Sequence, residues 1–96
     1  MKSRELRAAI VLLLDDRHRA DPSRTVGDSE IAEALEAPIE EVCRQLDILE
    51  EQGYTNAANS LESQSAYISA AGMALADELR EAAEAETPAE RPIGFD

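Results

Sequence analysis

The sequence predicts one mainly helical domain with a small β-hairpin, an α+β fold, and three observations support this. The chain has 96 residues, enough for one domain with a modest core. Apolar residues recur at helical spacing along most of it. Between residues 54 and 69 this spacing stops, and short polar and tyrosine-containing runs indicate two antiparallel strands, about 54–59 and 65–69. We assign the domain to residues 1–85 and predict a loose tail over 86–96, which contains two prolines and a glycine.

The first helix is expected to begin at Ser3, whose hydroxyl can cap it. Its helically spaced apolar residues are Leu6, Ala9, Ile10, Leu13 and Leu14, and Val11 and Leu12 widen the apolar face. A face this wide can be covered on more than one side, and a second protein chain is one possible cover. The helix should fade over residues 17–20, because Pro22 biases the residue before it away from helix. Thr25 and Val26 could form a very short strand.

Two further helices separated by a tight turn are expected next. Asp28 is a natural N-cap for the first of them, in which Ile31 and Leu35 face one way. Residues 36–38 make the turn, and Pro38 suits the first position of the following helix. In that helix the spacing predicts one buried apolar stripe, formed by Ile39, Val42, Leu46 and Leu49. Gly53 should end it with a positive φ.

A last helix is predicted from "SAAGMALADELREAAEAE", which begins at Ser69. Its apolar face comprises Met73, Ala76, Leu79 and Ala83. Its acidic side is most simply explained as a solvated helix face beside a packing stripe.

The formal net charge is −12, and Lys2 is the only lysine. High Asp and Glu with scarce Lys resembles the proteins of halophiles that accumulate salt, and an ordinary acidic protein is the alternative. The charge is uneven. Residues 1–24 contain six cations and four acids, whereas residues 25–96 contain three cations and seventeen acids. The first helix and the loop after it are therefore the one relatively basic region.

Several classes of protein are disfavoured by the sequence. The longest apolar run, "AAIVLLL", is too short to span a membrane, and no signal-peptide pattern precedes it, so we expect a soluble, cytoplasmic protein without membrane contact. Cys43 is the single cysteine, which excludes an internal disulfide. The sequence contains no nucleophile–base arrangement, glycine-rich phosphate loop or metal-ligand cluster. We therefore expect no enzyme, no catalytic residues, no bound metal and no cofactor.

The segment "EIAEALEAPIEEVCRQLDILEEQGY", residues 30–54, resembles the helix-turn-helix core of winged-helix transcription regulators, including the MarR-like and PadR-like groups. The matching residues are Ile31, Ala32, Leu35, Val42, Leu46, Leu49, Gly53 and Tyr54. "AYISAAG" is similar to the family's exit from the wing into a capped last helix, with Ser69 and Gly72 in the corresponding places. The resemblance covers about residues 4–84 and implies a winged helix-turn-helix that binds double-stranded DNA, with the third helix in the major groove.

The resemblance places DNA-reading residues on the third helix at Glu40, Glu41, Arg44, Gln45 and Ile48. Arginine suits guanine, glutamine suits adenine, and glutamate can accept a hydrogen bond from cytosine N4. Contacts from the wing and to the backbone would come from Asn56, Asn59, Ser60, Gln64, Arg17, Arg19 and Arg24.

Charge opposes this implication at ordinary salt. Residues 38–52 contain five acids and one cation, and residues 55–65 contain no Lys or Arg, although DNA affinity rests largely on cations that neutralise phosphates. Two function classes therefore stay open. The first is a DNA-binding transcription regulator, adapted to high salt and acting as a homodimer through its first or last helix or both. The second is a winged-helix module for protein–protein contact that does not bind DNA.

Two side chains have both a functional and a structural interpretation. Cys43 could be a redox sensor, or a small, partly buried core residue. His18, with Asp15 and Asp16, could form part of a metal site, or could be a surface residue at the end of a helix. The structural interpretation is favoured for both.

Overall fold

The computed structural model describes residues 2–57 and 65–86 and has the predicted mainly helical fold with a small sheet. In chain order the elements are α1 (Ser3–Ala20), β1 (Val26–Gly27), α2 (Asp28–Leu35), α3 (Ile39–Glu51), β2 (Thr55–Ala57), β3 (Ser65–Ile68) and α4 (Ala70–Glu86). The order helix, short strand, helix, helix, hairpin, helix is that of a winged helix-turn-helix. No helix among the described residues is both long and apolar enough to cross a membrane.

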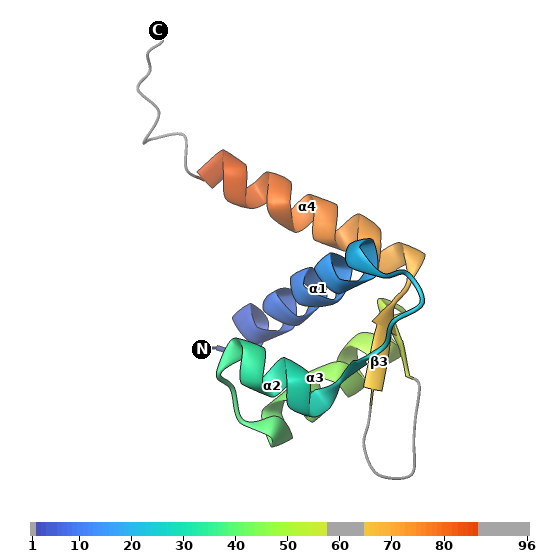
Figure 1. Cartoon of the computed structure of the whole chain (residues 1–96). Helices are drawn as coiled ribbons and strands as arrows, with labels where there is room; N and C mark the ends of the chain where they lie inside the picture. The colour runs from blue at the N-terminus through green and yellow to red at the C-terminus, as the bar shows by residue number, and fades with distance from the viewer. Residues whose placement is uncertain (1, 58–64, 87–96) are drawn as a thin grey trace, which may run out of the picture.

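Helix α1 lies between α4 on one side and the α2–α3 pair on the other (Figure 1). It therefore contributes most to the hydrophobic core, as its wide apolar face predicted. The buried apolar residues are Leu6, Ile10, Val11, Leu14, Val26, Ile31, Val42, Leu46, Leu49, Ala66, Ile68 and Ala76. The far end of α4 extends beyond the rest of the domain (Figure 1).

The sheet is antiparallel with the order β1-β3-β2, so β3 is its central strand. Val26 pairs with Ala66, and Thr55 pairs with Ile68. These four side chains are buried. The alternation of a strand then turns Tyr67 outward, where it is 40% exposed. The two predicted hairpin strands are confirmed, with β2 beginning one residue later and β3 ending one residue earlier than predicted. The predicted strand residues 58 and 59 lie outside the described residues.

Three helices begin one residue away from the predicted caps. Lys2, Gly27 and Pro38 are the N-cap residues, with extended ψ angles of 155°, 154° and 139°. Ser3 and Asp28, the predicted caps, are therefore the first helical residues, so α1 and α2 begin one residue earlier than predicted. Pro38, predicted as the first helical residue, is instead the cap, and α3 begins one residue later. In each case the cap is the last residue whose backbone is still extended.

The junction between α3 and α4 matches the prediction closely. Gly53 has φ +87° and ends α3. The Ser69 hydroxyl donates to the Gly53 carbonyl at 2.6 Å and accepts from the Gly72 amide at 3.1 Å, so it caps α4. The Ser69 amide donates to the Tyr54 carbonyl at 3.0 Å. The start of α4 is thereby fixed against the end of α3, and a Cβ on Gly72 would lie 2.1 Å from the Tyr54 oxygen.

The buried stripe of α3 differs from the prediction at two positions. Val42, Leu46 and Leu49 are buried as expected, but Ile39 is 40% exposed and Gln45 is 1% exposed. Helical side chains lean toward the helix N-terminus, so the side chain of the first residue projects past the end of the helix. This explains why Ile39 leaves the core although its spacing fits. Gln45 is buried instead of Ile39, because its amide group forms hydrogen bonds with Arg7 and Glu41.

Candidate nucleic-acid interface

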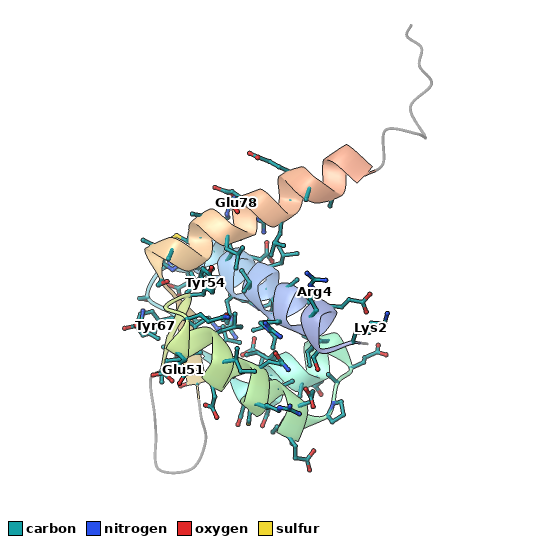
Figure 2. All side chains as sticks on the ribbon, turned by 180° about the vertical axis from the view of Figure 1, so that it is seen from behind. Lys2, Arg4, Glu51, Tyr54, Tyr67 and Glu78 are labelled. Atoms are coloured by element: carbon teal, nitrogen blue, oxygen red, sulfur yellow. The ribbon has the colours of Figure 1, made fainter. Side chains whose placement is uncertain are left out.

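The outward face of α3, opposite its buried stripe, contains Glu40, Arg44, Asp47 and Glu51, all exposed. Arg44 is the single cation of α3, and its side chain is 70% exposed. Its Nη1 lies 3.8 Å from Glu41 Oε1, a long contact that leaves most of the guanidinium accessible. Figure 2 shows Glu51 at the end of this helix that lies near Tyr54 and Tyr67. The face thus combines one projecting arginine with three carboxylates.

Gln45 does not lie on this face, and the prediction that it reads bases is corrected here. Its Oε1 accepts from Arg7 Nε at 2.9 Å, and its Nε2 donates to Glu41 Oε2 at 3.0 Å. The side chain therefore joins α1 to α3 inside the domain. Because Gln45 is only 1% exposed, it presents no amide donor or acceptor to adenine.

Glu41 and Ile48 lie at the edge of the outward face. The Glu41 side chain is 32% exposed, and its carboxylate also lies within 3.5 Å of the Ser3 hydroxyl. It is held by neighbours on α1 and α3, which limits its reach. Ile48 is half-buried. Of the five predicted reading residues, Glu40 and Arg44 are thus fully presented, Glu41 and Ile48 partly, and Gln45 is not.

The loop arginines that were predicted to contact phosphates are engaged with carboxylates. Arg24 Nη2 lies 2.7 Å from Glu30 Oε2, and Arg17 Nε lies 3.5 Å from the same oxygen. Arg17 Nη1 also approaches Asp16 at 3.7 Å. These pairs tie the end of α1 and the following loop to the first turn of α2. The basic surplus of residues 1–24 is therefore partly used within the fold.

Arg19 belongs to a second ion-pair cluster, centred on Asp15. Arg19 Nε lies 3.0 Å from Asp15 Oδ2 and its Nη2 lies 3.2 Å from Asp77. Arg80 Nη1 lies 2.5 Å from the same Asp15 oxygen, whose side chain is 2% exposed. This cluster joins α1 to α4. The i,i+4 spacing of Asp15 and Arg19 was a readable signal for one pair, but the α4 partners are about sixty residues away in sequence.

The wing is the hairpin formed by β2 and β3, and its described residues carry neutral polar groups. Asn56 is exposed and is the cross-strand partner of Tyr67. Figure 2 shows Tyr67 pointing away from the helices. Tyr67 was not predicted as a site residue, although its place in an alternating strand indicated an outward side chain. The other predicted wing residues, Asn59, Ser60 and Gln64, lie outside the described residues.

Cys43 has the surroundings of a structural cysteine. Its Sγ donates to Asp28 Oδ2 at 3.2 Å, and the side chain is partly buried. Burial, the hydrogen bond to Asp28 and the nearby charges of Asp28, Asp47 and Glu40 raise the pKa of the Cys43 thiol to about 11. A thiol that stays protonated at neutral pH reacts slowly with oxidants. The redox interpretation is therefore disfavoured.

The possible metal site at His18 is not assembled among the described residues. Asp15 is occupied by Arg19 and Arg80, and His18 Nδ1 is buried without a hydrogen-bond partner there. Within the described part of the chain, no group of three or more His, Cys, Asp or Glu side chains could hold a metal ion.

A cleft of about 200 Å³ lies between α1, α3 and α4, with Ala8, Val11, Leu75 and Leu79 among its apolar walls. A second, more open hollow continues along α1 and α4, lined by Arg4, Glu5, Ala8, Leu79, Ala82 and Ala83. Together they form a largely apolar groove on the side of the domain away from the outward face of α3. Figure 2 shows Arg4 on α1 at this side and Glu78 on the outer side of α4.

Solved structures of two proteins resemble this fold. The heme sensor protein PefR from Streptococcus agalactiae in complex with heme gives a TM-score of 0.74 at 14% identity, covering 94% of this chain and 60% of that one. PefR with heme and carbon monoxide gives 0.69 at 15%, covering 84% and 55%. The C30AH42A mutant of Lactococcus lactis ZitR in apo form gives 0.73 at 18%, covering 97% and 67%. PefR and ZitR are winged-helix transcription regulators.

These identities establish the shared fold. The chain spans 55% to 67% of the length of the matched structures. The sequence matches no protein-family model and no curated protein.

Proposed function

We propose that this protein is a sequence-specific DNA-binding transcriptional regulator, with α3 as the helix that enters the major groove. The observation that supports this most is Arg44, which projects 70% exposed from the outward face of α3 on a helix-turn-helix scaffold. Solved regulators share that scaffold along nearly the whole of this chain. In this binding mode the recognition helix presents its outward residues to base edges.

Each presented residue has a role suited to its chemistry. The Arg44 guanidinium donates two parallel hydrogen bonds to guanine O6 and N7. Glu40 accepts from cytosine N4, which lets an acid contribute to reading although it repels phosphate. Ile48 and Glu41 contact the groove wall at the edge of the helix, and Asn56 donates to a phosphate from the wing.

The proposed regulator works at high salt. Arg17, Arg19 and Arg24 are paired with carboxylates, so these three cations are less available to neutralise phosphates. Repulsion between the acids of α3 and DNA is screened within about 3 Å at 1 M salt. Potassium ions that bridge carboxylates and phosphates would reduce it further. Binding then depends on direct base contacts, which lose little as salt rises.

The protein acts as a homodimer through α1 and α4. The groove along these helices is lined by Ala8, Leu79, Ala82 and Ala83, and α4 extends past the rest of the domain (Figure 1). Small side chains let a second helix approach closely, and burial of Leu79 would add hydrophobic free energy. A dimer also presents two copies of α3 to successive turns of one face of the duplex.

The test is retention of duplex fragments from a random-sequence pool, titrated from ~0.1 M to ~3 M KCl, because phosphate-driven binding falls steeply over this range. The proposal predicts that particular sequences are enriched, and that they are retained at the upper end of the range. No enrichment at any salt, with the helical circular dichroism signal unchanged, would contradict it.

A second candidate function is a winged-helix module for protein–protein contact. The observation that favours it is the outward face of α3, where Glu40, Asp47 and Glu51 surround one arginine. Such a face suits a basic protein surface as well as a screened duplex. Failure of DNA enrichment, combined with salt-sensitive capture of a Lys- and Arg-rich partner by the wild-type chain, would support this second function.

A further inference from the structure

Ile39 is one of two large apolar side chains exposed among the described residues, the other being Tyr67 in the wing. The apolar residues that pack against the core from partly buried positions are Leu12, Leu13, Ala32, Leu35, Ala37, Tyr54, Met73, Leu75 and Leu79, and Ile39 is not among them. Its spacing fits the buried stripe, yet it is 40% exposed at the first position of α3. An isoleucine held at this position exposes apolar surface on the helix proposed to read DNA.

The position of Ile39 is well defined. Pro38 precedes it with φ −63° and ψ 139°, so the ring fixes the direction from which the chain enters α3. The side chain leans past the N-terminal end of the helix. In helix-turn-helix proteins the N-terminal residues of the recognition helix are those nearest the base edges. Ile39 is thus placed where a side chain of α3 would enter the groove first.

On one side, Ile39 is followed along the helix by a partly buried cysteine. Cys43, one helical turn further on, carries a protonated thiol that donates to Asp28, and this carboxylate is 8% exposed. Glu40 and Arg44 lie on the adjacent outward face. The start of α3 therefore presents the exposed part of the Ile39 side chain beside its polar reading residues. An apolar side chain in the major groove has one specific complement, the 5-methyl group of a pyrimidine.

We infer that Ile39 is a specificity-determining residue that contacts the 5-methyl group of a pyrimidine, thymine or 5-methylcytosine, in the major groove. This inference rests on the proposed DNA-binding function and names a contact within that site. It also suits the salt dependence proposed above, because apolar contact is not weakened by screening and is strengthened by some salts. A reading helix with few phosphate contacts gains from such a contact at molar salt.

The test begins with the duplex enriched by the wild-type protein at ~2 M KCl, a concentration at which phosphate-driven binding is largely lost. Each thymine is replaced in turn by deoxyuridine, which removes the methyl group and keeps base pairing. A second set of duplexes has cytosine or 5-methylcytosine at the same positions. Affinities are measured for the wild type, for Ile39→Ala, and for Tyr67→Ala, which removes the other exposed apolar side chain as a matched control.

The inference predicts that at one thymine of each half-site deoxyuridine weakens wild-type binding about fourfold, the effect expected for one buried methyl-sized group. At the same position, the wild type should bind the 5-methylcytosine duplex about fourfold more tightly than the cytosine duplex, because the two differ by the same methyl group. Ile39→Ala should bind both forms equally, while Tyr67→Ala should keep the wild-type difference. Circular dichroism checks that Ile39→Ala stays folded, as expected for an exposed position.

Two results would overturn the inference and are distinguishable. If the wild type binds its enriched duplex but no thymine is sensitive to deoxyuridine, or if Ile39→Ala keeps the sensitivity, Ile39 does not read a methyl group and DNA reading by α3 still stands. If no duplex is enriched at all, the proposed DNA-binding function fails, and the inference fails with it.

Discussion

Gly72→Ala should destabilise the protein, although alanine favours helices. Gly72 lies in the first turn of α4, where an added Cβ would be 2.1 Å from the Tyr54 carbonyl oxygen and 2.6 Å from Ile68 Cγ1. The first of these atoms belongs to backbone that is already fixed by its hydrogen bond from Ser69. Since real Cβ contacts stay beyond 3.0 Å, the start of α4 must move by about 1 Å away from the end of α3.

The expected size follows from three contributions. Overpacking against backbone costs about 1–3 kcal/mol. Weakening the hydrogen bond between the Ser69 amide and the Tyr54 carbonyl costs about 1 kcal/mol. The higher helix propensity of alanine returns about 1 kcal/mol. The net loss is about 2 kcal/mol in the free energy of unfolding, which corresponds to a fall in Tm of roughly 8–16 °C for a domain of this size.

The assay is reversible urea unfolding followed by circular dichroism, with Gly27→Ala as the matched control. A Cβ on Gly27 meets nothing within 4 Å, and its φ of −74° is ordinary for alanine. We expect the control to change stability by less than about 1 kcal/mol, because only unfolded-state entropy changes. A Gly72→Ala protein as stable as the wild type would refute the close approach between α4 and the end of α3.

Three further predictions concern single side chains. Gln45→Ala should lower the free energy of unfolding by about 2 kcal/mol, the net contribution of a hydrogen bond to a charged group, because it removes the acceptor of Arg7 Nε. Urea unfolding measures this loss, and an unchanged midpoint would argue against the hydrogen bond between Arg7 and Gln45. Because burial and Asp28 raise the pKa of Cys43 from 9.0 to about 11, the protonated thiol stabilises the fold below pH 9, and this contribution is lost as pH rises toward 11. The midpoint of the pH profile of alkylation should therefore fall toward 9.0 in Asp28→Asn, and a midpoint that does not move would argue against the hydrogen bond. The Ser23 hydroxyl and amide lower the pKa of Asp21 below 3.8. Ser23→Ala removes the hydroxyl and keeps the amide, so it should raise that pKa part of the way toward 3.8 in an NMR titration, and the stabilisation lost as pH falls through it should become smaller.

The elements of the fold were predictable because their signals are local. Apolar spacing predicted the four helices, Gly53 predicted the end of α3, and Ser69 predicted the cap of α4. The starts of α1, α2 and α3 were each one residue off, because the last extended residue before each helix is not the one that side-chain preference indicates. The start of α4 agreed with the prediction. Differences of one residue are ordinary at helix ends.

The candidate site was less predictable because its residues depend on distant partners. Ile39 and Gln45 both fit the helical stripe, and the choice between them rests on Arg7, thirty-eight residues before Gln45. Spacing favours the apolar residue, yet a buried amide with satisfied partners costs little. The sequence likewise predicted that Arg24 contacts a phosphate, but in the structure it forms an ion pair with Glu30. A charge count along the chain cannot separate a free cation from a paired one.

The central claim is that α3 reads DNA through Arg44, and its most direct test is the binding of one enriched duplex and one scrambled duplex by the wild type, Arg44→Ala and Arg44→Lys. Fluorescence anisotropy at ~0.1 M and ~2 M KCl measures each affinity. Our account predicts that the wild type prefers the enriched duplex at ~2 M KCl, where repulsion is screened, and that Arg44→Ala loses about 5- to 150-fold of this preference, the discrimination expected of one bidentate pair. Arg44→Lys should not restore it, because lysine lacks the planar fork. Equal binding of both duplexes by the wild type, or a preference that Arg44→Ala retains in full, would contradict the account.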